Sequence, residues 1–471
     1  LLLTLAIMMV GSTVFAGSID YLSNQSAKYL TTFHRTASTD ASADIACYNP
    51  AGTALLAPGL YLDLSSQTLL KYYETDTSDS RAQTGVGVYT KLSALGQGFK
   101  DKYEQSEPTL ILPNFYAVYN FGQMGPGKLA AYAQLGVSAG GGALKWDDGT
   151  AATFGALSGI FKTAGGTGAV TDQSFEASSV YYTINAGAAY AFLDDMVSVS
   201  VGGKAIIAKR TMKVSGTDGT RSIDGEFDYD ATGYTAVIGL DVKPIKDLTL
   251  AARYEMETDL EFDYDQKKLN ASSALVTTIA TSVLGMSGVS DGQKANNNLP
   301  AILSLGAEYK VTPELAVMAS SNIYFLSQAD MGKTNIKNAA GTAVVAVKDT
   351  NEYFGTGYEF GLGATYLIMP ELKAGLGFMY TESGAKDAYF NNQDTFLNCA
   401  GNPPLDSYTI GLGGTYTVIQ NLDVTLSGSW THYLPETYKI GDATTAPGQK
   451  EIAGEYKKDV YNIGLGVGYK M

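Results

Sequence analysis

The chain has 471 residues and a formal net charge of -15, with 53 Gly and 32 Tyr but only 13 Pro and 2 Cys. Its mean hydropathy is -0.02. The acidic charge argues against a nucleic acid partner, because phosphate binding requires clustered Lys and Arg. A soluble secreted protein of this length often carries several disulfides, and two cysteines allow one at most. Abundant Gly and Tyr fit transmembrane β-strands, in which aromatic residues mark the membrane interfaces.

Residues 1–16 (LLLTLAIMMVGSTVFA) form the only long apolar run of the chain. The run ends in Val14-Phe15-Ala16, with small residues at the positions that a signal peptidase reads, so we expect a signal peptide and an exported protein. The initiator Met and a basic region are missing before it, which predicts a sequence truncated at its start. An N-terminal anchor helix is the alternative, although spanning a bilayer normally takes about 20 apolar residues.

Period-two alternation is the dominant signal in the rest of the chain. In the last expected strand, one face is apolar and holds Tyr461, Ile463, Leu465, Val467, Tyr469 and Met471. The other face is small or polar and holds Asn462, Gly464, Gly466, Gly468 and Lys470. This pattern is typical of a strand with lipid on one side and a lumen on the other. A C-terminal strand of this kind is what barrel-assembly machinery usually reads, so we expect that partner during biogenesis.

The same alternation recurs in about fourteen segments. They are residues 59–74, 108–121, 128–139, 180–193, 196–212, 226–243, 247–260, 301–311, 314–326, 352–368, 371–382, 407–418, 421–434 and 456–471. Very short turns join them in pairs, at residues 122–128, 193–196, 243–247, 311–314, 368–371 and 418–421. Longer polar connections lie between the pairs, such as residues 140–178, 261–299 and 383–406.

Short turns on one side and long loops on the other are typical of outer-membrane barrels. A closed barrel also leaves no unpaired strand edge. We therefore predict an all-β fold, a membrane-spanning antiparallel up-and-down β-barrel of about 14 strands over residues 59–471. We expect it in outer-membrane lipid of a Gram-negative bacterium, with both termini periplasmic. A secreted soluble sandwich or β-solenoid is the alternative, but it would not need an apolar outward face on every strand.

Residues 17–58 precede the first strand and do not alternate. They contain DASADIACYNPAG from Asp40 to Gly52, which ends in Asn49-Pro50-Ala51-Gly52. These four residues favour a turn, because Pro fixes φ and disfavours a helical residue before it. At this position the segment resembles the hatch of the long-chain fatty acid outer-membrane transporter family (FadL/TodX type), which carries a similar Asp-Ala-Ser…Asn-Pro-Ala-Gly motif.

The resemblance continues through residues 182–202, 299–317, 358–376 and 408–426 and so covers essentially the whole mature chain. It implies a monomeric fourteen-stranded barrel whose lumen is plugged by a hatch, here residues 17–58. It also implies passive uptake of hydrophobic compounds, most of all long-chain fatty acids or other lipophiles such as hydrocarbons. The family releases ligands sideways beside a kinked third strand. An element that the family has after that strand is replaced here by Gly140-Gly141-Gly142-Ala143.

Two long loops contain apolar residues at helical spacing. In residues 270–287 these are Leu275, Val276, Ile279, Ala280, Val283 and Leu284. In residues 151–162 they are Phe154, Leu157, Ile160 and Phe161. An exposed apolar groove of this kind suits capture of a lipophilic ligand, and the family uses loop helices in this way. The alternative is that these residues pack the loops against each other or against the barrel.

A fatty-acid carboxylate would favour a basic partner in the lumen. Alternation places Lys204 and Arg253 on the inner face, although a bulge at Gly203 would shift Lys204 out of register. The alternative is that both cations pair with lumen acids such as Glu255.

The alternative functions are a phospholipase, a general porin and a surface antigen or adhesin. A phospholipase needs a Ser–His pairing, but His34 lies in the hatch and His432 has no G-x-S-x-G partner. Two His and two distant Cys, Cys47 and Cys399, supply a metal site poorly, so we expect no catalytic residue, metal or cofactor; whether the cysteines pair stays open. A general porin has no N-terminal plug. A surface antigen or adhesin is the third alternative and is compatible with transport.

Overall fold

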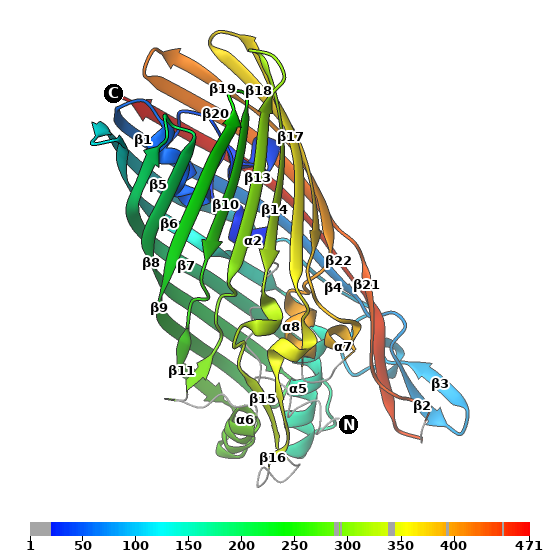
Figure 1. Cartoon of the computed structure of the whole chain (residues 1–471). Helices are drawn as coiled ribbons and strands as arrows, with labels where there is room; N and C mark the ends of the chain where they lie inside the picture. Colours follow the sequence, from blue (N-terminus) through cyan, green and yellow to red (C-terminus); the bar gives the residue numbers. More distant parts are fainter. Residues whose placement is uncertain (1–19, 287–291, 293, 338–343, 392–394, 445–446) are drawn as a thin grey trace.

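Fourteen antiparallel strands form a closed barrel in the described part of the chain (Figure 1). The computed structural model describes residues 20–471 except 287–291, 293, 338–343, 392–394 and 445–446. The strands of the wall are β1 (Gly59–Asp76), β5 (Thr109–Met124), β6 (Gly127–Trp146), β7 (Asp172–Phe192), β8 (Val197–Thr217), β9 (Ser222–Ile245), β10 (Leu248–Glu255), β13 (Ile302–Lys310), β14 (Leu315–Tyr324), β17 (Gly357–Met369), β18 (Leu372–Glu382), β19 (Ser407–Ile419), β20 (Leu422–Tyr433) and β22 (Lys450–Lys470). Each pairs with the next, and β22 pairs with β1, so the predicted fold class is confirmed.

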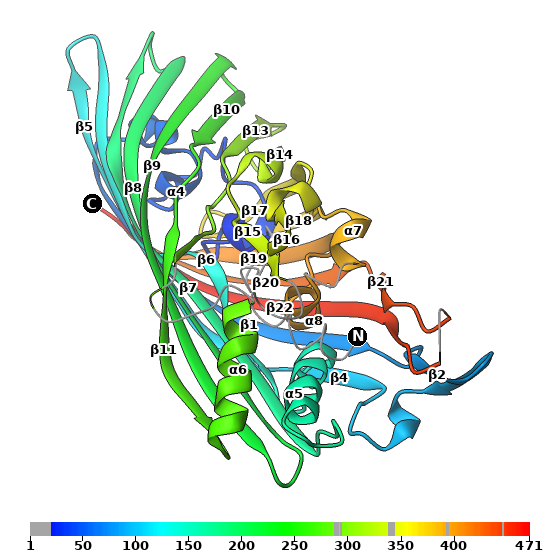
Figure 2. The same ribbon diagram turned by 90° about the horizontal axis from the view of Figure 1, so that it is seen from below.

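The two ends of the barrel differ. At the short-turn end, pairs such as β7 and β8 are joined by a few residues, and the C-terminus lies there (Figure 1). The long-loop end carries the additional strands β2 (Arg81–Gly85), β3 (Val88–Lys91), β4 (Lys102–Gln105), β11 (Glu261–Ala271), β12 (Lys294–Asn296), β15 (Lys333–Lys337), β16 (Val344–Asp349) and β21 (Glu436–Gly441). Its helices are η2 (Ser93–Leu95), α5 (Ala151–Thr163), α6 (Ala274–Met286), η3 (Leu326–Gln328), η4 (Thr350–Tyr353), α7 (Asp387–Phe390) and α8 (Phe396–Gly401) (Figure 2). No helix among the described residues is long and apolar enough to cross a membrane.

The predicted strands lie close to the observed ones, with differences at the long-loop end. Strand β6 continues to Trp146 and β7 begins at Asp172, so residues 140–178 are not wholly a loop as predicted. The reason is that β7 and β8 pair over their entire lengths, from Asp172↔Thr217 to Phe192↔Val197, beyond the apolar part of the wall. The predicted segment 247–260 ends early at Glu255, and β11 forms a separate extension of the wall.

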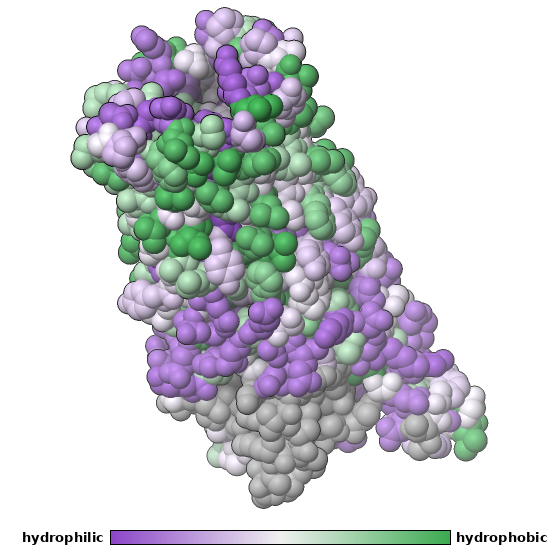
Figure 3. Space-filling view, in the orientation of Figure 1, coloured by the Kyte–Doolittle hydropathy of each residue, from purple (hydrophilic) through white to green (hydrophobic). Residues whose placement is uncertain are grey.

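The outer face of the wall carries a band of exposed apolar side chains, visible in green in Figure 3. It includes Leu64, Val201, Leu362, Leu412 and Leu465, which come from five different strands. Such a continuous apolar surface requires lipid rather than water around it. The alternation predicted for the last strand is confirmed by exposed Ile463 and buried Asn462. The soluble β-protein alternative is therefore excluded.

The N-terminal segment occupies the lumen at the short-turn end, where it is drawn in dark blue in Figure 1. Its helices are α2 (Asp20–Ser23), α3 (Tyr29–Thr32), α4 (Ile45–Tyr48) and η1 (Pro50–Leu55). The hatch packs so closely on β19 that a Cβ at Gly411 would lie 2.1 Å from the Leu30 carbonyl oxygen. The expected signal peptide, residues 1–16, lies outside the described residues.

The third strand of the wall, β6, is irregular. Its pairing with β5 ends at Asn114↔Gly136, although both strands continue toward the long-loop end. Its register with β7 shifts twice between Val137 and Gly142. Gly142 has a φ of +71°, which residues with a Cβ rarely adopt. The glycines expected after the third strand thus lie within it and form a bulge.

The close approach of hatch and wall leads to a stability prediction. We expect Gly411→Ala to destabilise the protein by about 1–3 kcal/mol, the usual cost of overpacking. Gly414→Ala is the matched control, because a Cβ there meets nothing closer than 3.4 Å. Thermal unfolding in detergent measures both variants. Equal melting temperatures for the two variants would contradict the close packing.

Candidate functional site

The Asn-Pro-Ala-Gly motif anchors the hatch to the barrel wall. Asn49 caps η1, accepting from the Ala51 N–H at 3.2 Å, and Pro50 occupies the first helical position, where no N–H is needed. The Asn49 amide donates to the Leu240 carbonyl and the Asp241 carboxylate of β9, both at 3.1 Å. The motif residues therefore bind the wall.

The other two motif residues, Ala51 and Gly52, also lie in close contact with the wall. The Ser198 hydroxyl donates to the Ala51 carbonyl at 2.7 Å. A Cβ at Gly52 would lie 3.1 Å from the Asp241 carboxylate, a contact tighter than ordinary van der Waals distance. Asn120 of β5 donates to the carbonyls of residues 53, 54 and 56. Polar side chains of two wall strands, β8 and β5, thus satisfy backbone groups of the hatch that would otherwise be buried without partners.

Buried ion pairs hold the remainder of the hatch. Arg35 donates to Asp44 at 3.1 Å and to Asp40 at 2.9 Å, and Lys373 of β18 also pairs with Asp40. Burial alone would raise the pKa of Asp40, but Lys373 and Arg35 hold it well below its usual range. Lys28 pairs with Asp63 of β1 at 3.2 Å. Charge-assisted hydrogen bonds therefore join the expected hatch to strands β18 and β1.

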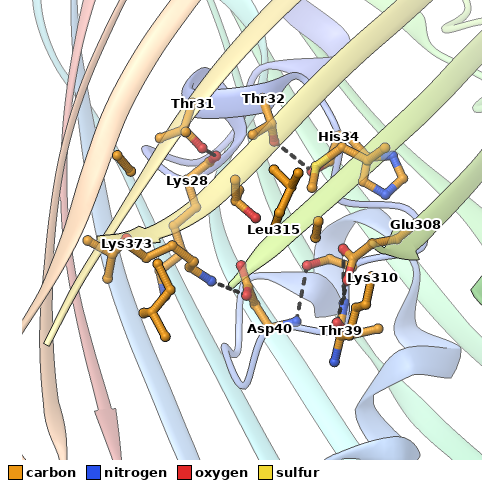
Figure 4. Close-up of a pocket in the computed structure, with 18 of the residues that line it drawn as sticks. Lys28, Thr31, Thr32, His34, Thr39, Asp40, Glu308, Lys310, Leu315 and Lys373 are labelled. Atoms are coloured by element: carbon orange, nitrogen blue, oxygen red, sulfur yellow. Dashed lines mark hydrogen bonds and ion pairs between the residues drawn. The ribbon is translucent and has the colours of Figure 1, made fainter. Parts of the chain in front are cut away.

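A polar cavity of about 210 Å³ lies between the hatch and strands β13, β14 and β17–β19 (Figure 4). Figure 4 shows Lys373 directed at Asp40, and Thr39 directed at Glu308. His34 also lines the cavity, and its ring nitrogens make no hydrogen bond of normal geometry with the described residues. Because its lining is charged, this cavity suits water better than a hydrophobic ligand.

Lys204 and Arg253 both point into the lumen, as predicted. The Gly203 bulge is not observed, because β7 and β8 pair without a register shift. Lys204 donates to Glu255 at 2.8 Å, and Arg253 pairs with the other carboxylate oxygen of Glu255. The alternative in which both cations pair with a lumen acid therefore describes this structure. Two cations share one carboxylate, so the three buried side chains carry a net positive charge.

The long-loop half of the lumen is filled mainly by aromatic and aliphatic side chains. A buried cluster lines it, with aromatic members that include Phe99, Tyr103, Trp146, Phe175, Phe227 and Phe262. Helix α5 lies in this cluster, and a Thr150–Thr153 capping box defines its start. The rings of Phe154 and Phe99 are 5.2 Å apart. The barrel thus has a polar, hatch-filled half and an aromatic half.

The two predicted sets of apolar loop residues, in 151–162 and in 270–287, differ in their exposure. Phe154, Leu157 and Phe161 are buried, so the prediction of an exposed groove is wrong for α5. Helical spacing marks an apolar face, but here the barrel wall and neighbouring loops cover that face. On α6, Leu275 is exposed and Val276 is buried, and Ile279 packs against the buried cluster. The side chains of Val283 and Leu284 lie outside the described residues.

Three buried lumen cations were not among the predicted site residues. The Cζ atom of Arg210 lies 4.0 Å from the centroid of the Phe262 ring. The Nζ atom of Lys458 lies 4.2 Å from the centroid of the Tyr433 ring. Lys71 of β1 is fully buried. Strand alternation alone places each of them inward, so the signal was present in the sequence. The cysteines are both buried and free: Cys47 in α4 and Cys399 in α8.

A lipid-facing barrel with an apolar lumen above a polar plug defines a class of outer-membrane transport barrels. The chain belongs to the family described as outer membrane protein transport protein (OMPP1/FadL/TodX), whose model matches residues 7–471. This family consists of outer-membrane channels for hydrophobic compounds and not of enzymes. No curated protein sequence matches the chain significantly.

Solved structures share the fold at low sequence identity. A Pseudomonas aeruginosa FadL homologue is 14% identical, with a TM-score of 0.63, and the match covers 98% of this chain and 99% of that one. The Ralstonia pickettii toluene transporter TbuX is 15% identical, with a TM-score of 0.57 and coverage of 96% and 99%. The P. putida toluene transporter TodX is 12% identical, with a TM-score of 0.55 and coverage of 94% and 98%.

Burial of His34 predicts a pH dependence of hatch stability. Burial and the neighbouring Arg35 lower the pKa of His34 to about 3, so the unfolded hatch binds a proton near its ordinary pKa of about 6.5 and the folded hatch does not. Hatch stability is then complete above that value and falls as the pH drops. Between pH 7 and 5 we expect a loss of about 2 kcal/mol, measured by hydrogen exchange of peptides from residues 20–58.

His34→Gln is the control, because Gln does not titrate. It should abolish the change between pH 7 and 5, whereas the acidic pairs of Asp40 lose stability only as the pH falls below the ordinary carboxyl range. An unaltered pH dependence in His34→Gln would contradict this assignment.

Proposed function

We propose that the protein takes up hydrophobic compounds passively, with long-chain fatty acids or hydrocarbons as substrates. The aromatic lining of the long-loop half of the lumen, which ends on the hatch, is the observation that carries the proposal. An apolar pocket with a few polar groups is the usual form of a hydrophobic ligand site. The long-loop end would face the outside and the short-turn end the periplasm, which gives the ligand an inward route.

The proposed route has four steps. Ligand first meets α6, where exposed Leu275 lies beside buried Val276. It then passes Phe154, Leu157 and Phe161 of α5 into the aromatic cluster, which has to rearrange because these side chains are packed together. Movement of the hatch opens the lumen, and the ligand leaves beside the bulged strand β6. No bond is made or broken, so the concentration gradient alone drives transport.

The Lys204–Glu255–Arg253 cluster supports a carboxylate ligand. Its net positive charge lies next to a small cavity between the hatch and the wall, which Arg253 lines together with Tyr29 and Tyr48. A charge-assisted bond to a ligand carboxylate would orient the head group there. The solved relatives described as toluene transporters support a neutral aromatic hydrocarbon instead. Arg253 should therefore affect the uptake of a fatty acid but not the uptake of a neutral hydrocarbon.

Uptake by proteoliposomes tests the transport proposal. We expect the intact protein to accelerate entry of a fluorescent long-chain fatty acid or of radiolabelled toluene over protein-free vesicles, without conducting hydrophilic solutes. Deletion of residues 17–56 should make the barrel leaky to hydrophilic solutes, because it removes the segment that fills the lumen. A general porin would conduct such solutes with the segment in place. No acceleration by the intact protein would contradict the proposal.

Substitution of Arg253 separates the substrate classes. Arg253→Met removes the net positive charge of the cluster, and we expect fatty-acid uptake to fall about tenfold, the usual worth of one charge-assisted hydrogen bond. Toluene uptake should not change. Lys457→Met, at a partly exposed lysine of β22, is the control for loss of a positive charge elsewhere. Equal fatty-acid uptake by the Arg253 and Lys457 variants would contradict the carboxylate assignment.

A further inference from the structure

A section of the barrel wall between β5 and β6 has no backbone ladder. The last paired residues are Asn114 and Gly136, but β5 begins five residues earlier, at Thr109, and β6 runs on to Trp146. At the junction the Asn114 side chain takes over from the ladder and accepts from the Val137 N–H at 3.0 Å. Pro113 has no N–H to offer. The two strands therefore part toward the long-loop end.

The parted section lies within the lipid-facing band. Leu110 and Ile111 of β5 are 64% and 70% exposed, although they are consecutive and alternation would hide one of them. On β6, Leu135 is exposed just before the strands part, Gly136 is half-buried, and residues 137–139 are all buried. Lipid therefore meets β5 on the outside, while β6 bends toward the lumen.

The side chain of Lys71 bridges the parted strands. Lys71 of β1 is fully buried, and its amino group donates to the Thr109 hydroxyl at 2.9 Å and to the Gly141 carbonyl at 2.8 Å. Its third acceptor is the Ala143 carbonyl. Thr109 belongs to β5, whereas Gly141 and Ala143 belong to β6. The Thr109 hydroxyl itself donates to Gly141 at 2.8 Å.

We propose that Lys71 is a latch residue that holds the wall closed between β5 and β6 and limits the passage of hydrophobic ligand from lumen to lipid. Elsewhere in the wall, backbone bonds satisfy the polar groups that lipid cannot. Here two N–H donors of the Lys71 amino group bond to β6 carbonyls and the third bonds to Thr109 of β5, so this side chain ties β6 to β5. A ligand that leaves by this route has to displace Lys71. The limit on ligand passage rests on the proposed function, whereas the closed wall does not.

The closed wall is testable without transport. Lys71→Met keeps the side-chain length and removes the donors, whereas Lys71→Arg keeps donors. The reporter is Ser138→Cys, at a buried residue beside the parted strands. In lipid vesicles, we expect a bilayer-dissolved maleimide to modify this cysteine about tenfold faster with Lys71→Met than with Lys71, and at nearly the original rate with Lys71→Arg. Peptide mass separates the reporter from buried Cys47 and Cys399.

Controls decide between a latch and a misfolded barrel. Heat-dependent electrophoretic mobility reports whether each variant is folded, and a membrane-impermeant charged maleimide should modify the reporter equally slowly in all of them. Equal rates with the bilayer-dissolved reagent in folded Lys71 and Lys71→Met proteins would overturn the latch, as would an equal acceleration with the charged reagent. Failure of the intact protein to accelerate fatty-acid or toluene entry would refute the proposed function and leave the labelling result standing.

Discussion

Backbone hydrogen bonding in lipid is the constraint on which the rest of this structure depends. A membrane offers no partner for an N–H or C=O group, so the strands must close into a ring. Closure leaves a lumen, and the described residues 20–58 fill its short-turn end. Where β6 parts from β5, side chains of Asn114 and Lys71 supply the missing bonds. This part of the wall is thus closed by side chains in place of a backbone ladder.

The two halves of the lumen are stabilised by different interactions. The hatch buries Arg35 and Asp44 together, and unpaired burial of either charge would cost several kcal/mol. Its polar contacts with Asp63, Asp241 and Lys373 are directional and exchangeable with water or other partners. The long-loop half is held by apolar contacts around α5. The described hatch residues thus lie below a buried cluster rich in aromatic side chains.

Much of the fold was predictable from the sequence, because alternation is a local property. Alternation located most of the fourteen strands to within a few residues. It also placed Lys204 and Arg253 in the lumen. The burial of α5 was not predictable, since helical spacing identifies an apolar face without saying what covers it. The ion pair of Asp40 with Lys373 joins residues 333 apart in sequence. The role of Lys71 depends on where β5 and β6 part, which is a property of their mutual register.

The proposed transport requires that hydrophobic molecules occupy the aromatic half of the lumen. An experimental structure of the protein extracted in detergent tests it most directly, because a bound hydrophobic ligand would be seen as density among the aromatic side chains. We predict elongated ligand density between α5 and the hatch, in contact with Phe154 and with its polar end toward Arg253. A continuous lumen that contains only water and ions would contradict the account.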